Sequence, residues 1–170
     1  MAWTVPRTWV PGELVTASMM NTQIRDNLTY LFSARGSCML YASSLLFAPV
    51  DSTTYYAGHP QTSSVQTAAD LSRVYVPATG TINAAYLSIV VEGTIGSTET
   101  SSAWIRKNNT SDTLISSSVQ ANQAAQYYSL VPNLSVTAGD SLQLKWTTPA
   151  WATNPTNVRM ALQLALQASG

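Results

Sequence analysis

The chain has 170 residues, only 9% of them charged, and eight acidic residues balance eight basic ones. An average soluble domain carries roughly 25% charged residues. A neutral chain without a run of Lys or Arg lacks the basic surface that nucleic-acid binding requires, so we expect no nucleic-acid partner. Because little electrostatic repulsion opposes association, the composition favours a surface that meets other protein.

The length suits one domain with a short appendage. A single cysteine, Cys38, excludes an intrachain disulfide. No stretch approaches the roughly 18 apolar residues of a membrane span, and the N-terminus lacks the apolar segment of a secretory signal. We therefore expect folding in a cytoplasm without membrane insertion.

Residues 1–15 predict an extended attachment arm, because Pro6 and the pair Pro11-Gly12 disfavour a helix. Trp3 and Trp9 lie in this arm with no local partner to bury them. Aromatic side chains on an extended arm commonly insert into pockets of another protein. The alternative is that they fold back on the chain's own domain.

Residues 16–33 contain neither Gly nor Pro and predict one short helix, with Thr16 or Ser18 as its N-cap and a joint that extends to residue 36. Steps of three and four residues define an apolar face, which Leu28 widens: Ala17, Met20, Ile24, Asn27 and Leu31. Because such a helix is marginal alone in water, this face must pack on the β domain, on sister copies or on a host surface. Asn27 suits either a polar layer that fixes the register between copies or an ordinary solvated position.

Residues 37–170 predict a head domain built of β-strands. Alternation with a period of two is clearest in residues 81–91 and 158–167, and Asn108-Asn109 and Ala138-Gly139-Asp140 mark turns. About eight strands without interleaved helices predict a mainly β fold, a single antiparallel β-sandwich, with a jelly roll as the leading candidate.

The residues for catalysis or metal binding do not form a recognisable pattern. His59 is the single histidine, and no Gly-x-Ser-x-Gly motif occurs. Zinc needs more Cys or His ligands, and the acidic residues lack calcium-loop spacing. Glu92 and Glu99 flank a loop and could approach each other as a carboxylate pair, but solvated loop acids are the simpler interpretation. We expect no enzyme, no cofactor and no metal.

Aromatic residues make ligand binding by the head more plausible than catalysis. Tyr55, Tyr56 and Trp151 are the candidates for stacking against sugar rings, and Trp151 lies in a loop between Pro149 and Pro155. Trp104 and Trp146 lie in alternating segments, which favours a role in the core or between subunits.

Two segments resemble known families. Residues 3–31 resemble the opening segment of a family of tailed-phage structural proteins, in which it precedes varied C-terminal sequences; the matching string is Trp3-Thr4-x-Pro6-Arg7-Thr8-Trp9-x-x-Gly12-Glu13-x-Val15-Thr16-Ala17-x-x-Met20-Asn21-Thr22-x-x-Arg25-Asp26-Asn27-Leu28. The later part is similar to jelly-roll heads of phage fibres, decoration proteins and the trimeric C1q/TNF group, through Val76-Pro77-x-x-Gly80-Thr81-Ile82 and Val136-x-Ala138-Gly139-Asp140-x-Leu142.

The resemblance implies a structural protein of a bacteriophage virion, assembled in the host cytoplasm: a capsid decoration or head-fibre protein, commonly trimeric, with an outward β head. Its partners would be sister copies and other capsid or tail proteins. The expected attachment residues are Trp3, Pro6, Trp9, Met20, Ile24, Leu28 and Leu31. The alternative is a tail-fibre or tail-knob adhesin whose head binds a host receptor or surface glycan.

Overall fold

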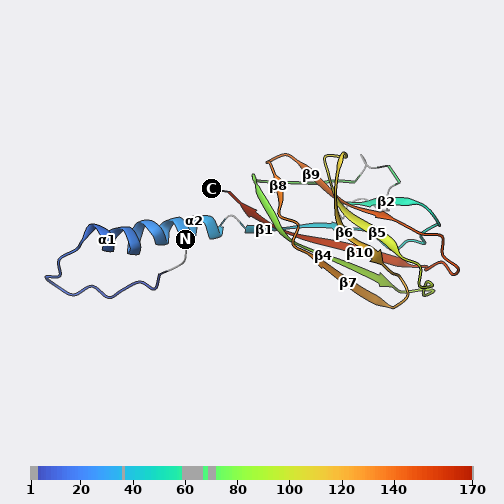
Figure 1. Cartoon of the computed structure of the whole chain (residues 1–170), viewed down its shortest axis with the longest axis horizontal. Helices are drawn as coiled ribbons and strands as arrows, with labels where there is room; N and C mark the ends of the chain where they lie inside the picture. The colour runs from blue at the N-terminus through green and yellow to red at the C-terminus, as the bar shows by residue number, and fades with distance from the viewer. Residues whose placement is uncertain (1–3, 36, 59–66, 69–71, 170) are drawn as a thin grey trace.

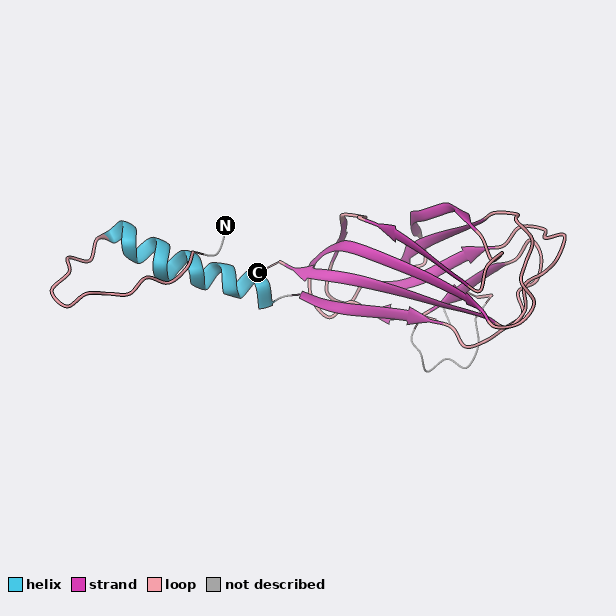
Figure 2. Ribbon diagram, turned by 90° about the horizontal axis from the view of Figure 1, so that it is seen from below, coloured by secondary structure: helices cyan, strands magenta, loops and turns pink. Residues whose placement is uncertain are grey.

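A computed structural model of the chain describes residues 4–35, 37–58, 67–68 and 72–169. An extended segment, a helix and a β head follow one another in chain order (Figure 1). The helix stands off one end of the head and lies against neither sheet, as both views of the ribbon show (Figures 1 and 2).

The helix runs without a break from Ala17 to Arg35, through α1 (Ala17–Met20), a π-helical segment η1 (Asn21–Asp26) and α2 (Asn27–Arg35). Thr16 caps its start, because its backbone is extended and its side chain accepts a hydrogen bond from the Met19 amide. The cap satisfies one of the amides that a helix start leaves without an intrahelical partner. The predicted helix is present, but it ends two residues later than expected and contains a π-helical segment that the sequence did not indicate.

The head consists of two antiparallel sheets with ten strands in the part of the chain that the structure describes. Sheet A has the order β1-β10-β4-β7, with β8 also pairing with β4: β1 (Ser37–Ser43), β10 (Val158–Ala168), β4 (Gly80–Val91), β7 (Ala125–Leu130) and β8 (Leu134–Val136). Sheet B has the order β2-β9-β5-β6, with β3 also pairing with β9: β2 (Thr54–Ala57), β9 (Ser141–Thr147), β5 (Ser101–Lys107), β6 (Ser111–Val119) and β3 (Val74–Tyr75).

Four of the ten are halves of two interrupted strands. β7 and β8 pair with successive parts of β4, and β2 and β3 pair with successive parts of β9. Pro132, which has no amide to donate, lies at the break between β7 and β8. We count β2 with β3 as one strand and β7 with β8 as another, which gives eight strands numbered in chain order. The two sheets then have the strand orders 1-8-3-6 and 2-7-4-5, which is the jelly-roll arrangement. The predicted mainly β, antiparallel sandwich is therefore confirmed.

The core lies between the sheets and follows the alternation of the strands. Every second residue of β10 from Val158 to Leu166 is buried. On β4 the register shifts by one residue at Asn83, so that Ile82 and Ala85 both face the core. At the end of the head away from the helix, four aromatic rings close the core: Phe47, Tyr55, Trp146 and Trp151.

Candidate interaction surfaces

The extended segment folds back along the chain's own helix. The Asn27 side chain is 4% exposed; its Oδ1 accepts from the Thr4 amide at 3.0 Å and its Nδ2 donates to the Thr4 carbonyl at 2.9 Å. One turn away, Gln23 Oε1 accepts from the Arg7 amide at 3.1 Å. Asn27 is thus neither solvated nor available to a polar layer between copies, because the arm occupies it. We call residues 4–35 the arm–helix hairpin.

A tight turn joins the arm to the helix. The Glu13 amide donates to the Val10 carbonyl at 3.0 Å, and Gly12 has a φ of +82°, a conformation that glycine adopts without steric cost. The Glu13 carboxylate also accepts from the Val10 amide and forms an ion pair with Arg7. Among the described residues, the contacts that hold the fold-back are therefore polar ones to backbone and side chain.

The apolar side chains of the hairpin remain open to solvent. Met20, Ile24, Leu28 and Leu31, which we call the helix stripe, are 43–60% exposed. On the arm, Val5, Val10 and Leu14 are more than 60% exposed, and Trp9 is 40% exposed with the Arg7 guanidinium 5.1 Å from its ring. Of the expected attachment residues, Pro6 is exposed as well, and Trp3 lies outside the described residues.

The outer face of sheet A is free of charge across its centre. Strand register aligns Tyr41, Gln163, Tyr86 and Ser129 in one row. The next row consists of Ser43, Ala161, Ser88 and Tyr127. We call these two rows, with Met39, the sheet A face. A groove of about 350 Å³ lies between Tyr86 and Tyr127.

Tyr86 and Tyr127 are 52% and 76% exposed, and Tyr86 was not among the residues that the sequence singled out. The signal was present in β4, where Tyr86 lies between the buried Ala85 and Leu87 and must point away from the core. The strand pairing of sheet A was needed to show that no described residue covers Tyr86 or Tyr127.

The outer face of sheet B differs, because it carries an ion-pair network. Asp112 accepts from Arg106 at 2.8 Å and from Lys145 at 2.5 Å, and Lys145 Nζ lies 4.8 Å from the centre of the Trp104 ring. Partial burial alone would raise the pKa of Asp112, but the hydrogen bonds from the two cations lower it overall. Register places Tyr56, Lys145 and Trp104 side by side.

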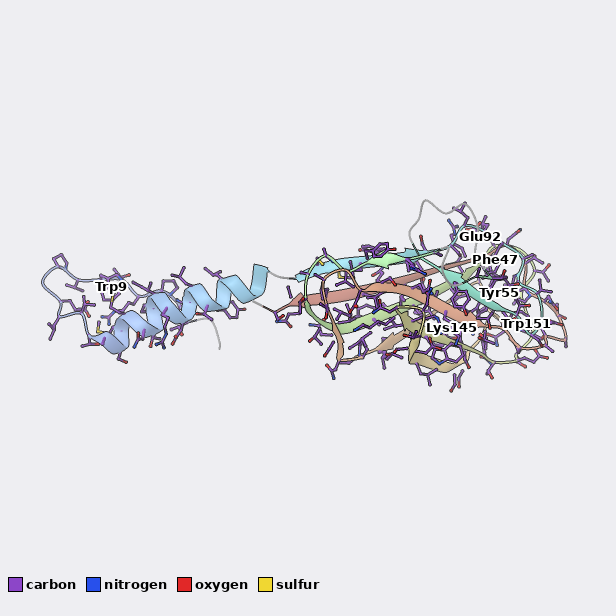
Figure 3. All side chains as sticks on the ribbon, turned by 90° about the horizontal axis from the view of Figure 1, so that it is seen from above. Trp9, Phe47, Tyr55, Glu92, Lys145 and Trp151 are labelled. Carbon is purple, nitrogen blue, oxygen red and sulfur yellow. The ribbon has the colours of Figure 1, made fainter. Side chains whose placement is uncertain are left out.

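Two of the three ligand candidates are buried, which corrects the expectation for them. Trp151 and Tyr55 are each 6% exposed, and Trp151 packs against the fully buried Trp146 with ring centres 5.9 Å apart. Figure 3 shows Trp151 and Tyr55 in the part of the head away from the helix. The Trp151 loop folds over the end of the sandwich, where Asp51 accepts from the Trp151 amide at 3.2 Å. Neither ring can offer a face to a ligand. Tyr56, the third candidate, is half-buried and faces outward beside Arg106.

The two loop acids engage different partners. Glu92 forms an ion pair with Arg159, and Glu99 accepts from the Ala152 amide at 3.1 Å. Within the described ranges no group of three His, Cys, Asp or Glu side chains is placed to hold a metal ion, and His59 lies outside those ranges. Of the helices that the structure describes, none has the length and apolar character to cross a membrane.

No protein-family model and no curated protein matches the chain. Among solved structures, the chain is similar to the Eiger TNF from S. frugiperda, with a TM-score of 0.34 and 15% sequence identity. The match covers 78% of this chain and 95% of that one. The jelly-roll assignment above rests on the strand order of the two sheets.

Proposed function

We propose that the chain is a structural component of a bacteriophage virion, a capsid decoration or head-fibre protein that attaches through the arm–helix hairpin and displays the β head. The observation that carries the proposal is the concentration of exposed apolar side chains on a hairpin that stands off the head. The resemblance of residues 3–31 to the opening of phage structural proteins supports the choice of the virion as the partner. The chain acts by binding and not by catalysis.

Burial of the exposed apolar side chains of the arm in a pocket of another protein would be energetically favourable. Val5, Val10 and Leu14 face solvent, and burying a side chain of this kind contributes about 1.5–3 kcal/mol. The arm's backbone is already held by Asn27 and Gln23, so docking would cost less conformational entropy than ordering a free segment.

We also propose a homotrimer with the sheet A face at the contact between copies. An uncharged face with exposed tyrosines suits a protein interface, whose core is enriched in aromatic residues and depleted of charge. The groove between Tyr86 and Tyr127 can receive a side chain of the neighbouring copy. The charged outer face of sheet B would then point away from the contact.

The attachment proposal is tested with two charge insertions in the full chain. The double variant Val5→Asp/Leu14→Asp alters the arm, and Val131→Asp alters an equally exposed apolar position on the head. We expect the arm variant to lose at least tenfold in co-sedimentation with purified particles, and the head variant to bind as the wild type does. Undiminished binding of the arm variant would contradict attachment through the arm.

A glycan-binding head is the second candidate function, and the outer face of sheet B carries the residues that would bind the glycan. Tyr56 and Trp104 present outward rings beside Lys145 and Arg106, a combination that suits stacking and hydrogen bonding to a sugar. This candidate predicts binding to host cells that Trp104→Ala abolishes. Unchanged binding in that variant would exclude this surface.

A further inference from the structure

We propose that the helix stripe is a second contact between sister copies: the helices pack side by side through Met20, Ile24, Leu28 and Leu31 as a parallel bundle, which leaves the arm to bind the virion. This inference rests on the homotrimer proposed above. It divides the hairpin into a self-association surface on the helix and an attachment surface on the arm.

The spacing of the stripe suits packing along a helix axis. Its four residues are separated by four, four and three positions, or eleven residues from Met20 to Leu31. An eleven-residue repeat corresponds to about 3.67 residues per turn, so such a stripe stays nearly parallel to the axis.

The chain's own arm does not occupy the stripe. It is anchored at Gln23 and at Asn27, which borders the stripe between Ile24 and Leu31, and the stripe residues stay about half exposed beside it. Between Met20 and Leu31 the charged residues of the helix are Arg25 and Asp26, whose side chains bind each other at 2.8 Å, and Arg35 follows at the end of the helix, beyond the stripe. No charge therefore lies within the stripe to oppose the approach of an identical helix.

The second copy is the occupant because the helix continues directly into sheet A. One residue separates Arg35, the end of α2, from Ser37, the start of β1, and β1 forms the edge of sheet A. Met39 and Tyr41 on β1 are 45% and 50% exposed on the sheet A face. Copies that meet through this face around a three-fold axis running along the strands would carry their helices at the same end and in the same direction.

The heads also compensate for the shortness of the stripe. Four apolar residues on one helix are too few to associate strongly by themselves, because isolated helices of this length are marginal in water. Once the heads are associated, the helices meet at an effective concentration in the millimolar range, which converts a weak contact into a populated one.

Cysteine crosslinking in the full chain tests the inference. In a Cys38→Ala background, Leu28→Cys places a thiol in the stripe, and Thr29→Cys places one on the adjacent, outward position of the same helix. We expect oxidation to give disulfide-linked dimers of the Leu28→Cys chain in at least tenfold higher yield than for Thr29→Cys. Light scattering on the same samples records the oligomeric state.

The crosslinking and light-scattering results test the helix bundle and the homotrimer separately. An oligomer in which Leu28→Cys crosslinks no better than Thr29→Cys would overturn the helix bundle and leave the homotrimer intact. A monomer in light scattering, with no crosslink at either position, would overturn the homotrimer and the bundle together. Binding of the arm to particles is measured separately and depends on neither result.

Discussion

Asp140 links two turns at one end of the sandwich. Its carboxylate accepts from Asn108 Nδ2 and from the Thr137 amide, each at 2.7 Å, and forms an ion pair with Lys107 at 2.8 Å. Asn108 has a φ of +51° in the three-residue connection between β5 and β6, where a left-handed Asn is favoured. The hydrogen bond from Asn108, followed by those from Lys107 and Thr137, lowers the pKa of Asp140 from 3.8 to about 2.

This shift predicts an acid-sensitive contribution to stability. Because the pKa in the folded chain lies below its ordinary value, ionised Asp140 stabilises the fold above about pH 4, and the contribution disappears as the pH falls toward 2. We expect Asp140→Asn to lower the Tm at pH 7 and to flatten the fall of the Tm between pH 5 and pH 2. Thermal unfolding across this range provides the measurement, with Asp26→Asn on the helix as the control; equal slopes in the wild type and Asp140→Asn would contradict the assignment.

At the scale of the element, the arm–helix hairpin is an extended segment fixed to a helix by two amide side chains. The contacts are few, polar and local to Asn27 and Gln23, while the apolar side chains of both segments point elsewhere. Such an element keeps the arm in one place without using the surface that a partner would need. The proposed division between an attachment arm and a self-associating helix requires this separation.

Asn27→Ala should release the arm. The substitution removes both hydrogen bonds to Thr4, each of which contributes roughly 1 kcal/mol, while alanine favours the helix itself. We expect the Thr4 amide to exchange with solvent at least five times faster and the helix amides to keep their protection. Hydrogen-exchange mass spectrometry measures both, and Asn21→Ala, at an exposed position of the same helix, is the matched control. Unchanged exchange at Thr4 would show that Asn27 does not hold the arm.

The whole molecule is asymmetric in charge between its two outer faces. Sheet B presents Arg106, Asp112 and Lys145, whereas the sheet A face presents tyrosine, serine, alanine and glutamine. The exposed ion pair of Arg159 and Glu92 lies at the border of the uncharged rows of sheet A, and the centre of that face is left without charge and suited to self-association. The helix leaves the head at the strand that borders this uncharged face.

A charge placed on the sheet A face should therefore prevent assembly. Tyr127→Lys introduces an ammonium group at the groove, and its burial between copies would cost several kcal/mol without a partner. We expect light scattering at micromolar concentration to give a trimer for the wild type and a monomer for Tyr127→Lys. Leu114→Lys, on the outer face of sheet B, should leave the trimer unchanged; a trimer that persists in Tyr127→Lys would place the contact elsewhere.

The sequence by itself determined the features that depend on near neighbours along the chain. The period-two alternation of residues 158–167, the helix with a cap at Thr16 or Ser18 and the Asn108-Asn109 turn all follow from local backbone preference and side-chain spacing. These features sufficed for a mainly β sandwich preceded by a helix, because regular elements of this length must bury their apolar face against one another.

Only the tertiary structure decided which aromatic and amide side chains are accessible. Trp151 is buried because Asp51, 100 positions away, holds its loop over the core, and Tyr127 is exposed because its neighbours in sheet A direct it outward. Asn27 binds Thr4, 23 positions earlier, and no local pattern marks that pair. Periodicity distinguishes the two faces of a strand or helix, but which face is covered depends on contacts between residues far apart in the chain.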